Sequence, residues 1–269
     1  MSVRWLAIPG LCLVAWGVLL AQKPFRTYQT EEAHAEADLP SDYMVPAEWT
    51  RGRLKYRSVG YSLHGFELGV NTWTIDYPRS DRHAALGIRR LTRVDAKSVE
   101  QVVEMDGSDD AYNWPFMYAV EVGHWKLSDS EAAQLRDYLL RGGFLMTDDF
   151  HGTLEWNVFA DSMQKVFPDR QIVDIDNKDA IFHVLYDLDD RYQIPGAQWL
   201  QSRITYEQDG FEAKWRGIYD DRGRIMVAIC HNMDLGDAYE WSDEPVYPEK
   251  WANLAYRILG NYVVYDLTH

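Results

Sequence analysis

The sequence predicts an α/β fold in which a mostly parallel sheet carries helices on both faces. Apolar runs of strand length alternate along the chain with longer segments of helical periodicity, and polar loops directly follow several of the apolar runs. The composition agrees: of 269 residues, 46% are hydrophobic and 26% charged, the balance of a globular protein with a sizeable core.

The first 22 residues have the pattern of an export signal. Arg4 precedes an uncharged apolar run over residues 6–20, which is shorter than the about 20 residues of a bilayer span. Ala21 suits a cleavage site, but Leu19 is larger than the residue usual there, so an uncleaved N-terminal anchor is the alternative to a cleaved signal peptide. We expect a periplasmic or secreted protein that contacts membrane only through this segment.

Residues 23–50 are polar and acidic, without periodicity, and are expected to form an extended arm before a single domain over residues 51–269. The chain has 27 basic and 42 acidic residues, a formal net charge of −15. Such a chain repels phosphate backbones, so we expect no nucleic-acid partner.

The first half of the domain carries three strand and three helix signals. Strands are expected over residues 70–75, 116–122 and 144–147, and helices over residues 82–91, from 128 to the glycines at 142–143, and over 154–167. The second of these helices has the clearest start, because Ser128 and Glu131 form a capping-box pattern.

The second half begins its regular structure with a hairpin. Strands over residues 214–219 and 224–230 flank a turn at 220–223, so a β-hairpin is expected near the C-terminal part of the fold. The last helix places one apolar stripe on one side, formed by Trp251, Leu254, Ala255, Ile258, Leu259 and Tyr262.

Polar loops follow three of the predicted strands, as DYPRSD (76–81), GHW (123–125) and TDDFHG (147–152). Because the carboxyl ends of parallel strands share one edge of a sheet, these loops and residues 230–234 are expected to form a ligand site there. The candidate ligand-binding residues are Asp76, Tyr77, Arg79, Asp81, His124, Trp125, His231 and Asp234. Simpler interpretations stay open: Asp76 and Asp81 can cap turns, and His124, His183 and His231 can be structural.

Asp148 and Asp149 are the strongest catalytic candidates, together with His151. Two adjacent carboxylates repel each other unless a cation, an arginine such as Arg79 or an imidazolium compensates them. A divalent metal is therefore the one cofactor that the sequence suggests, with Asp148, His151 and His124 as candidate ligands.

Familiar catalytic motifs are absent. The sequence has no G-x-S-x-G elbow, no H-E-x-x-H zinc motif and no phosphate-binding glycine loop. Beyond Cys12 in the signal the only cysteine is Cys230, so no disulfide is expected within the exported chain. In a strand the neighbouring His231 points to the opposite face, so Cys230 is expected to be buried and structural.

The segments DYPRSD, LRDYLLRGGFLMTDDFHG and RGRIMVAICHNMDLGDAYEW resemble the bacterial family catalogued as domain of unknown function 4159, over about residues 50–269. The resemblance implies a flavodoxin-like three-layer sandwich, similar to class I glutamine amidotransferases and ThuA proteins, in exported or membrane-associated proteins. The amidotransferase cysteine follows the strand that here is 144–147, where this chain has Asp148, Asp149 and Phe150. The resemblance therefore implies no thiol amidotransferase activity.

Three functions follow from these observations. The first is binding of a small molecule or carbohydrate at the acidic edge, near Trp73, Trp125, Trp156 and Trp241, and the second is a scaffold role with a protein partner in the cell envelope. The third is hydrolysis in which an aspartate or histidine activates water, with or without a metal. The first two are favoured because no nucleophile or metal motif is complete.

Overall fold

The structure is a computed structural model that describes residues 22–30, 32–58 and 71–269. The predicted export signal lies almost entirely outside the described residues, as does the start of the strand expected at 70–75. Among the helices that the structure describes, none combines the length and apolar character that a membrane span requires.

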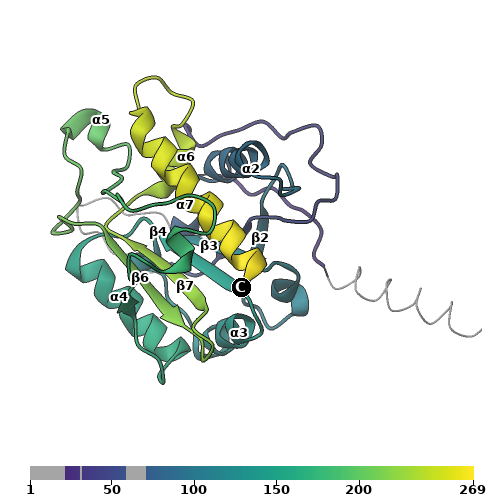
Figure 1. Cartoon of the computed structure of the whole chain (residues 1–269). Coiled ribbons are helices and arrows are strands. Elements are labelled where there is room, and N and C mark those ends of the chain that lie inside the picture. Colours follow the sequence, from purple (N-terminus) through teal and green to yellow (C-terminus); the bar gives the residue numbers. More distant parts are fainter. Residues whose placement is uncertain (1–21, 31, 59–70) are drawn as a thin grey trace, which may run out of the picture.

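A seven-stranded sheet forms the centre of the molecule (Figure 1). Its strands are β1 (Gly52–Lys55), β2 (Gln101–Glu104), β3 (Phe116–Val120), β4 (Phe144–Asp148), β5 (Val173–Asp174), β6 (Lys214–Tyr219) and β7 (Ile225–His231), in the order β2-β1-β3-β4-β7-β6-β5. The first five in this order are parallel, and β6 and β5 are antiparallel to their neighbours. The predicted α/β class and the β6–β7 hairpin are confirmed.

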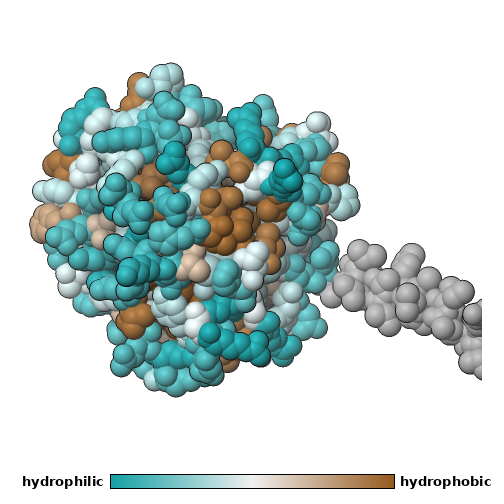
Figure 2. Space-filling model, in the orientation of Figure 1, coloured by the Kyte–Doolittle hydropathy of each residue, from teal (hydrophilic) through white to brown (hydrophobic). Residues whose placement is uncertain are grey.

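Helices cover both faces of the sheet. They are α2 (Arg79–Leu91), α3 (Asp129–Leu140), α4 (Gly152–Val166), α5 (Trp199–Ser202), α6 (Leu235–Glu240) and α7 (Glu249–Thr268), with short 3-10 turns at Thr72–Thr74, Asp109–Asn113, Val122–His124 and Ala180–Phe182. Alternate residues of β3 point to opposite sides: Tyr118 joins the core under α2, α6 and α7, and Met117 joins the core under α3 and α4. Figure 2 shows a mostly hydrophilic surface on the face that carries α7, with one group of hydrophobic residues near its middle.

One predicted strand is wrong, and three strands were missed: β1, β2 and the two-residue β5. Residues 72–74 form a 3-10 turn, and the strand that precedes the DYPRSD loop is β1. Both β1 and its neighbour β2 are only four residues long and carry polar side chains, so they lack the apolar runs that identify buried strands. The Arg53 side chain of β1 is fully buried because Asp81 neutralises it, 3.1 Å away.

The other predicted elements agree closely with the structure. The Ser128–Glu131 capping box is present, and α2 begins three residues earlier than expected, directly after Pro78. The last helix is longer than its apolar stripe, because it continues to Thr268.

The arm between residues 22 and 50 lies along the domain (Figure 1). Its described residues contain no helix or strand beyond a single bridge at Trp49, yet Ala35 and Trp49 are fully buried. The Arg82 guanidinium of α2 donates hydrogen bonds to the carbonyl oxygens of Ala37 and Asp38, at 2.5 and 2.8 Å. Packing against the domain therefore holds this arm.

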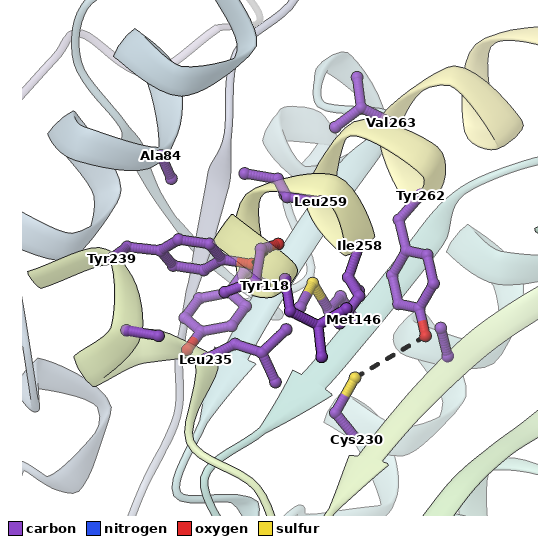
Figure 3. Close-up of a cluster of buried hydrophobic side chains, with 14 of the residues drawn as sticks. Ala84, Tyr118, Met146, Cys230, Leu235, Tyr239, Ile258, Leu259, Tyr262 and Val263 are labelled. Carbon is purple, nitrogen blue, oxygen red and sulfur yellow. Dashed lines mark hydrogen bonds between the residues drawn. The ribbon is translucent and has the colours of Figure 1, made fainter. Parts of the chain in front are cut away.

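Cys230 is buried in the core between β7 and α7, with its Sγ atom 3.8 Å from the Tyr262 hydroxyl (Figure 3). Burial raises the pKa of the thiol well above its usual value, and the thiolate is the reactive form.

We expect a thiol reagent to label Cys230 only in urea, and Cys230→Ala to cost on the order of 1 kcal/mol of stability. The variant is also the control that assigns labelling to this residue, and rapid labelling of native Cys230 would contradict its structural role.

Candidate functional site

The carboxyl ends of β3, β4 and β7 meet at one edge of the sheet, where the backbone turns sharply. Glu121, Asp149 and Asn232 follow these strands directly with φ angles of 52°, 52° and 64°, and Asp76 has a φ of 60°. Non-glycine residues seldom adopt this left-handed conformation, and such residues cluster at functional sites. The Glu121 amide donates to the Asp148 carbonyl at 3.1 Å, which keeps neighbouring strand ends together.

Three buried carboxylates converge at this edge. One oxygen atom from each of Asp76, Asp149 and Asp234 lies within 4.8 Å of the other two, and the three residues are 2, 6 and 4% exposed. Burial is the main cause that raises the pKa of all three well above the ordinary value, and carboxylates around them add to it. Within the described part of the chain, no lysine or arginine forms an ion pair with them.

Asp148 lies beside this group and connects β4 to the start of α6. Its Oδ2 atom accepts hydrogen bonds from the Tyr118 hydroxyl at 3.1 Å and from the amides of Leu235 and Gly236 at 2.8 and 2.9 Å. Burial raises the pKa of Asp148 to about 7, although these hydrogen bonds act in the opposite direction. Asp148 therefore fixes the turn that carries Asp234.

Two histidines border the carboxylates. His151 places Nε2 3.2 Å from Asp149 Oδ1, while its Nδ1 atom is buried and has no hydrogen-bond partner among the residues described. The His124 Nε2 atom lies 3.4 Å from a carboxylate oxygen of both Glu121 and Glu155. Glu155, on α4, also accepts the backbone amide of His151, so the two imidazoles share one network.

The structure brings Asp76, His124, Asp148, Asp149 and His151 to this edge, together with Asp234. Asp76 reaches it although the described residues before it form a 3-10 turn, Thr72–Thr74, in place of the expected strand.

The remaining candidates have other partners. Asp81 pairs with Arg51 and Arg53, Tyr77 accepts the amide of Tyr28, and Arg79 pairs with Asp243 and Glu244. Trp125 stacks on Phe159 in the core, and His183 pairs with Asp187. His231 faces the Gly152 carbonyl at 3.2 Å, and burial lowers its pKa to about 4.

Sequence reasoning missed further acidic residues of this edge, among them Glu32, Glu121, Glu155, Asp237 and Glu240. Glu32 comes from the arm and accepts the backbone amide of Asp76 at 2.7 Å. Asp234, Asp237 and Glu240 are spaced three residues apart, and this spacing is a signal for one face of a helix.

A comparison with protein families places most of the chain in a known group of sequences. The family described as "Domain of unknown function (DUF4159)" matches residues 58–267. The chain belongs to the DUF4159 family. The matched region contains every acidic residue of the edge except Glu32, and leaves β1 and the arm outside it. No curated protein matches the chain. Membership of DUF4159 therefore identifies the domain.

Proposed function

We propose that Asp76, Asp149 and Asp234 bind a divalent cation, and that the protein uses it in hydrolysis. The observation that carries the proposal is the approach of three buried carboxylates to within 4.8 Å of one another, with no lysine or arginine paired to them among the described residues and only the His151 imidazole beside Asp149. Buried carboxylates are stable only when they are protonated, paired or bound to a metal. An all-oxygen set suits Mg²⁺, Mn²⁺ or Ca²⁺.

The side chains around the three carboxylates suit proton transfer. A divalent cation lowers the pKa of a bound water, which makes a nucleophile at neutral pH. If His151 carries its proton on Nε2 and donates a hydrogen bond to Asp149, the lone pair on Nδ1 is available to accept a proton. His124, between Glu121 and Glu155, is a second imidazole from which a proton can be supplied.

No observation favours an aromatic carbohydrate platform at this edge. Trp73 and Trp125 are buried in the core, Trp241 stacks on His34 with ring centroids 3.6 Å apart, and Arg216 covers Trp156. The scaffold role likewise has no support in the described contacts. We also propose that the protein is exported, and that it is related to amidotransferase-like and ThuA proteins. The relationship is supported by the parallel strand order and by the left-handed residues after β3 and β4.

Calorimetric titration of chelator-treated protein with Mn²⁺, Mg²⁺ and Ca²⁺ tests the site. We expect the wild type to bind, and Asp149→Asn or Asp234→Asn to weaken binding at least tenfold. Asparagine tolerates the left-handed backbone at position 149, so the turn is retained. The matched control is Asp174→Asn, because that carboxylate is 81% exposed and pairs with Arg216 on β6. Equal binding by the wild type and both site variants would contradict the proposal.

Hydrolysis is measured separately, with 4-nitrophenyl phosphate and 4-nitrophenyl acetate as probes. The expected result is Mn²⁺-dependent turnover that His151→Gln reduces at least tenfold while cation binding is retained. Turnover that is unchanged in both His151→Gln and Asp149→Asn would contradict a role for this edge in the reaction.

A further inference from the structure

Helix α6 directs a second set of carboxylates at Asp76. Asp234 precedes the helix as its N-cap, and Asp237 and Glu240 follow at three-residue steps along it. One oxygen atom from each of Asp76, Asp237 and Glu240 lies within 4.8 Å of the other two. Asp76 therefore belongs to two groups of three carboxylates at once.

Asp76 approaches α6 closely because residue 236 is glycine. A Cβ atom at Gly236 would overlap the Oδ2 atom of Asp76, so this oxygen lies directly against the helix backbone. The same oxygen is buried, and no residue in the described ranges donates a hydrogen bond to it. A buried acceptor in a residue that belongs to both groups of carboxylates needs a donor or a cation.

When its carboxyl groups are ionised, the cluster carries more negative charge than one divalent cation can neutralise. The two groups together contain five carboxylates, contributed by Asp76, Asp149, Asp234, Asp237 and Glu240. The basic groups that face them are few among the residues described. The His34 imidazole of the arm lies 3.2 Å from Glu240, and the His151 imidazole lies 3.2 Å from Asp149. Arg79 is directed to Asp243 and Glu244, and Arg53 is held by Asp81.

We propose that Asp76, Asp237 and Glu240 bind a second divalent cation, so that the Asp76 carboxylate bridges two metal ions. This inference rests on the proposed function, because the first cation occupies the group of Asp76, Asp149 and Asp234. The oxygen-only donors again favour Mg²⁺, Mn²⁺ or Ca²⁺. Paired cations of this kind bind the attacking and the leaving oxygen in hydrolytic enzymes.

The alternative is a cluster in which neighbouring carboxyl groups share protons. Burial and the adjacent Asp237 raise the pKa of Glu240 to about 9, so this residue retains a proton at neutral pH when no cation is bound. Protonated carboxyl groups and a second cation predict different stoichiometries for metal binding.

Counting Mn²⁺ by equilibrium dialysis and recording its electron paramagnetic resonance spectrum distinguish the two. We expect two Mn²⁺ per wild-type chain with a spin-coupled spectrum, and one Mn²⁺ with an uncoupled spectrum in Glu240→Gln and in Asp237→Asn. Asp149→Asn is also expected to retain one, and Asp76→Asn to weaken both by at least tenfold. Glu244→Gln is the matched control, because this partly exposed carboxylate beyond α6 contacts Arg79 and is expected to leave the count at two.

Each outcome decides between the claims. One Mn²⁺ in the wild type, unaffected by Glu240→Gln and Asp237→Asn but lost in Asp149→Asn, would overturn the second site and leave the first intact. Two Mn²⁺ that persist in both α6 variants would also overturn it. No bound Mn²⁺ in a folded wild-type protein would remove both proposals. Asp237→Asn and Glu240→Gln are two separate tests of the second site, because each isosteric substitution alone is expected to abolish the binding of one Mn²⁺.

Discussion

Asp81→Asn is expected to destabilise the folded protein by about 3–5 kcal/mol, because it leaves buried positive charge without a counter-ion. The Asp81 carboxylate is 0% exposed and pairs with the Arg51 and Arg53 guanidinium groups at 2.9 and 3.1 Å. Arg53 also donates to the Trp73 and Ile75 carbonyls, so it cannot move to solvent without breaking the turn before α2. Asparagine keeps the shape of the side chain, removes its charge and replaces one of the two oxygens that face Arg51 and Arg53 with an NH₂ donor.

Urea unfolding followed by tryptophan fluorescence measures this loss, with Asp174→Asn as the control. The Asp174–Arg216 pair is exposed, so its removal is expected to cost less than about 1 kcal/mol. Similar unfolding midpoints for the two variants would show that the buried pairs do not stabilise the fold. A folded Asp81→Asn protein that fails to bind cations would instead restore Asp81 to the ligand site.

The buried network of Asp81 also explains which strands could be predicted from sequence. Strands β3, β4 and β7 are buried along their whole length, so each is an apolar run that is visible in the sequence. Strand β1 has Arg53 at a buried position, and this is favourable only because Asp81, 28 residues later, folds back against it. No local pattern contains that contact, so the sequence favoured a strand at 70–75 instead.

The candidate site was predictable to a similar extent. Asp149 and Asp76 could be placed at one edge because parallel strands share their carboxyl ends, even though the strand assigned before Asp76 was wrong. Asp237 and Glu240 were missed because α6 has only six residues, too short for a clear helical period. Glu32 was missed because a polar, aperiodic arm gives no sign that it packs against the domain.

Divalent cation is expected to stabilise the protein strongly, since a ligand that binds only the folded state contributes about 2.7 kcal/mol at a hundred times its Kd. Thermal unfolding of chelator-treated protein with and without Mn²⁺ at pH 8 measures the effect. The double variant Asp149→Asn/Asp234→Asn is expected to show a smaller Mn²⁺-dependent shift than the wild type, because only the second group, Asp76, Asp237 and Glu240, is left to bind the cation. A wild-type transition that does not respond to Mn²⁺ would contradict the site.

The stability of the cation-free protein is expected to depend on pH. Burial raises the pKa values of Asp76, Asp149 and Asp234 above those of the unfolded chain. Acids with raised pKa values retain protons in the folded state, so the folded state loses stability as the pH rises above about 4, the ordinary pKa of aspartate. Cation-free wild type is therefore expected to unfold more easily at pH 8 than at pH 5, and the double variant to lose less stability between these values because asparagine does not titrate.

Mn²⁺ should remove most of the wild-type loss at pH 8, because it replaces the protons as the counter-charge of the three carboxylates. An identical pH dependence in the wild type and the double variant would mean that other groups determine the acid–base behaviour of the fold.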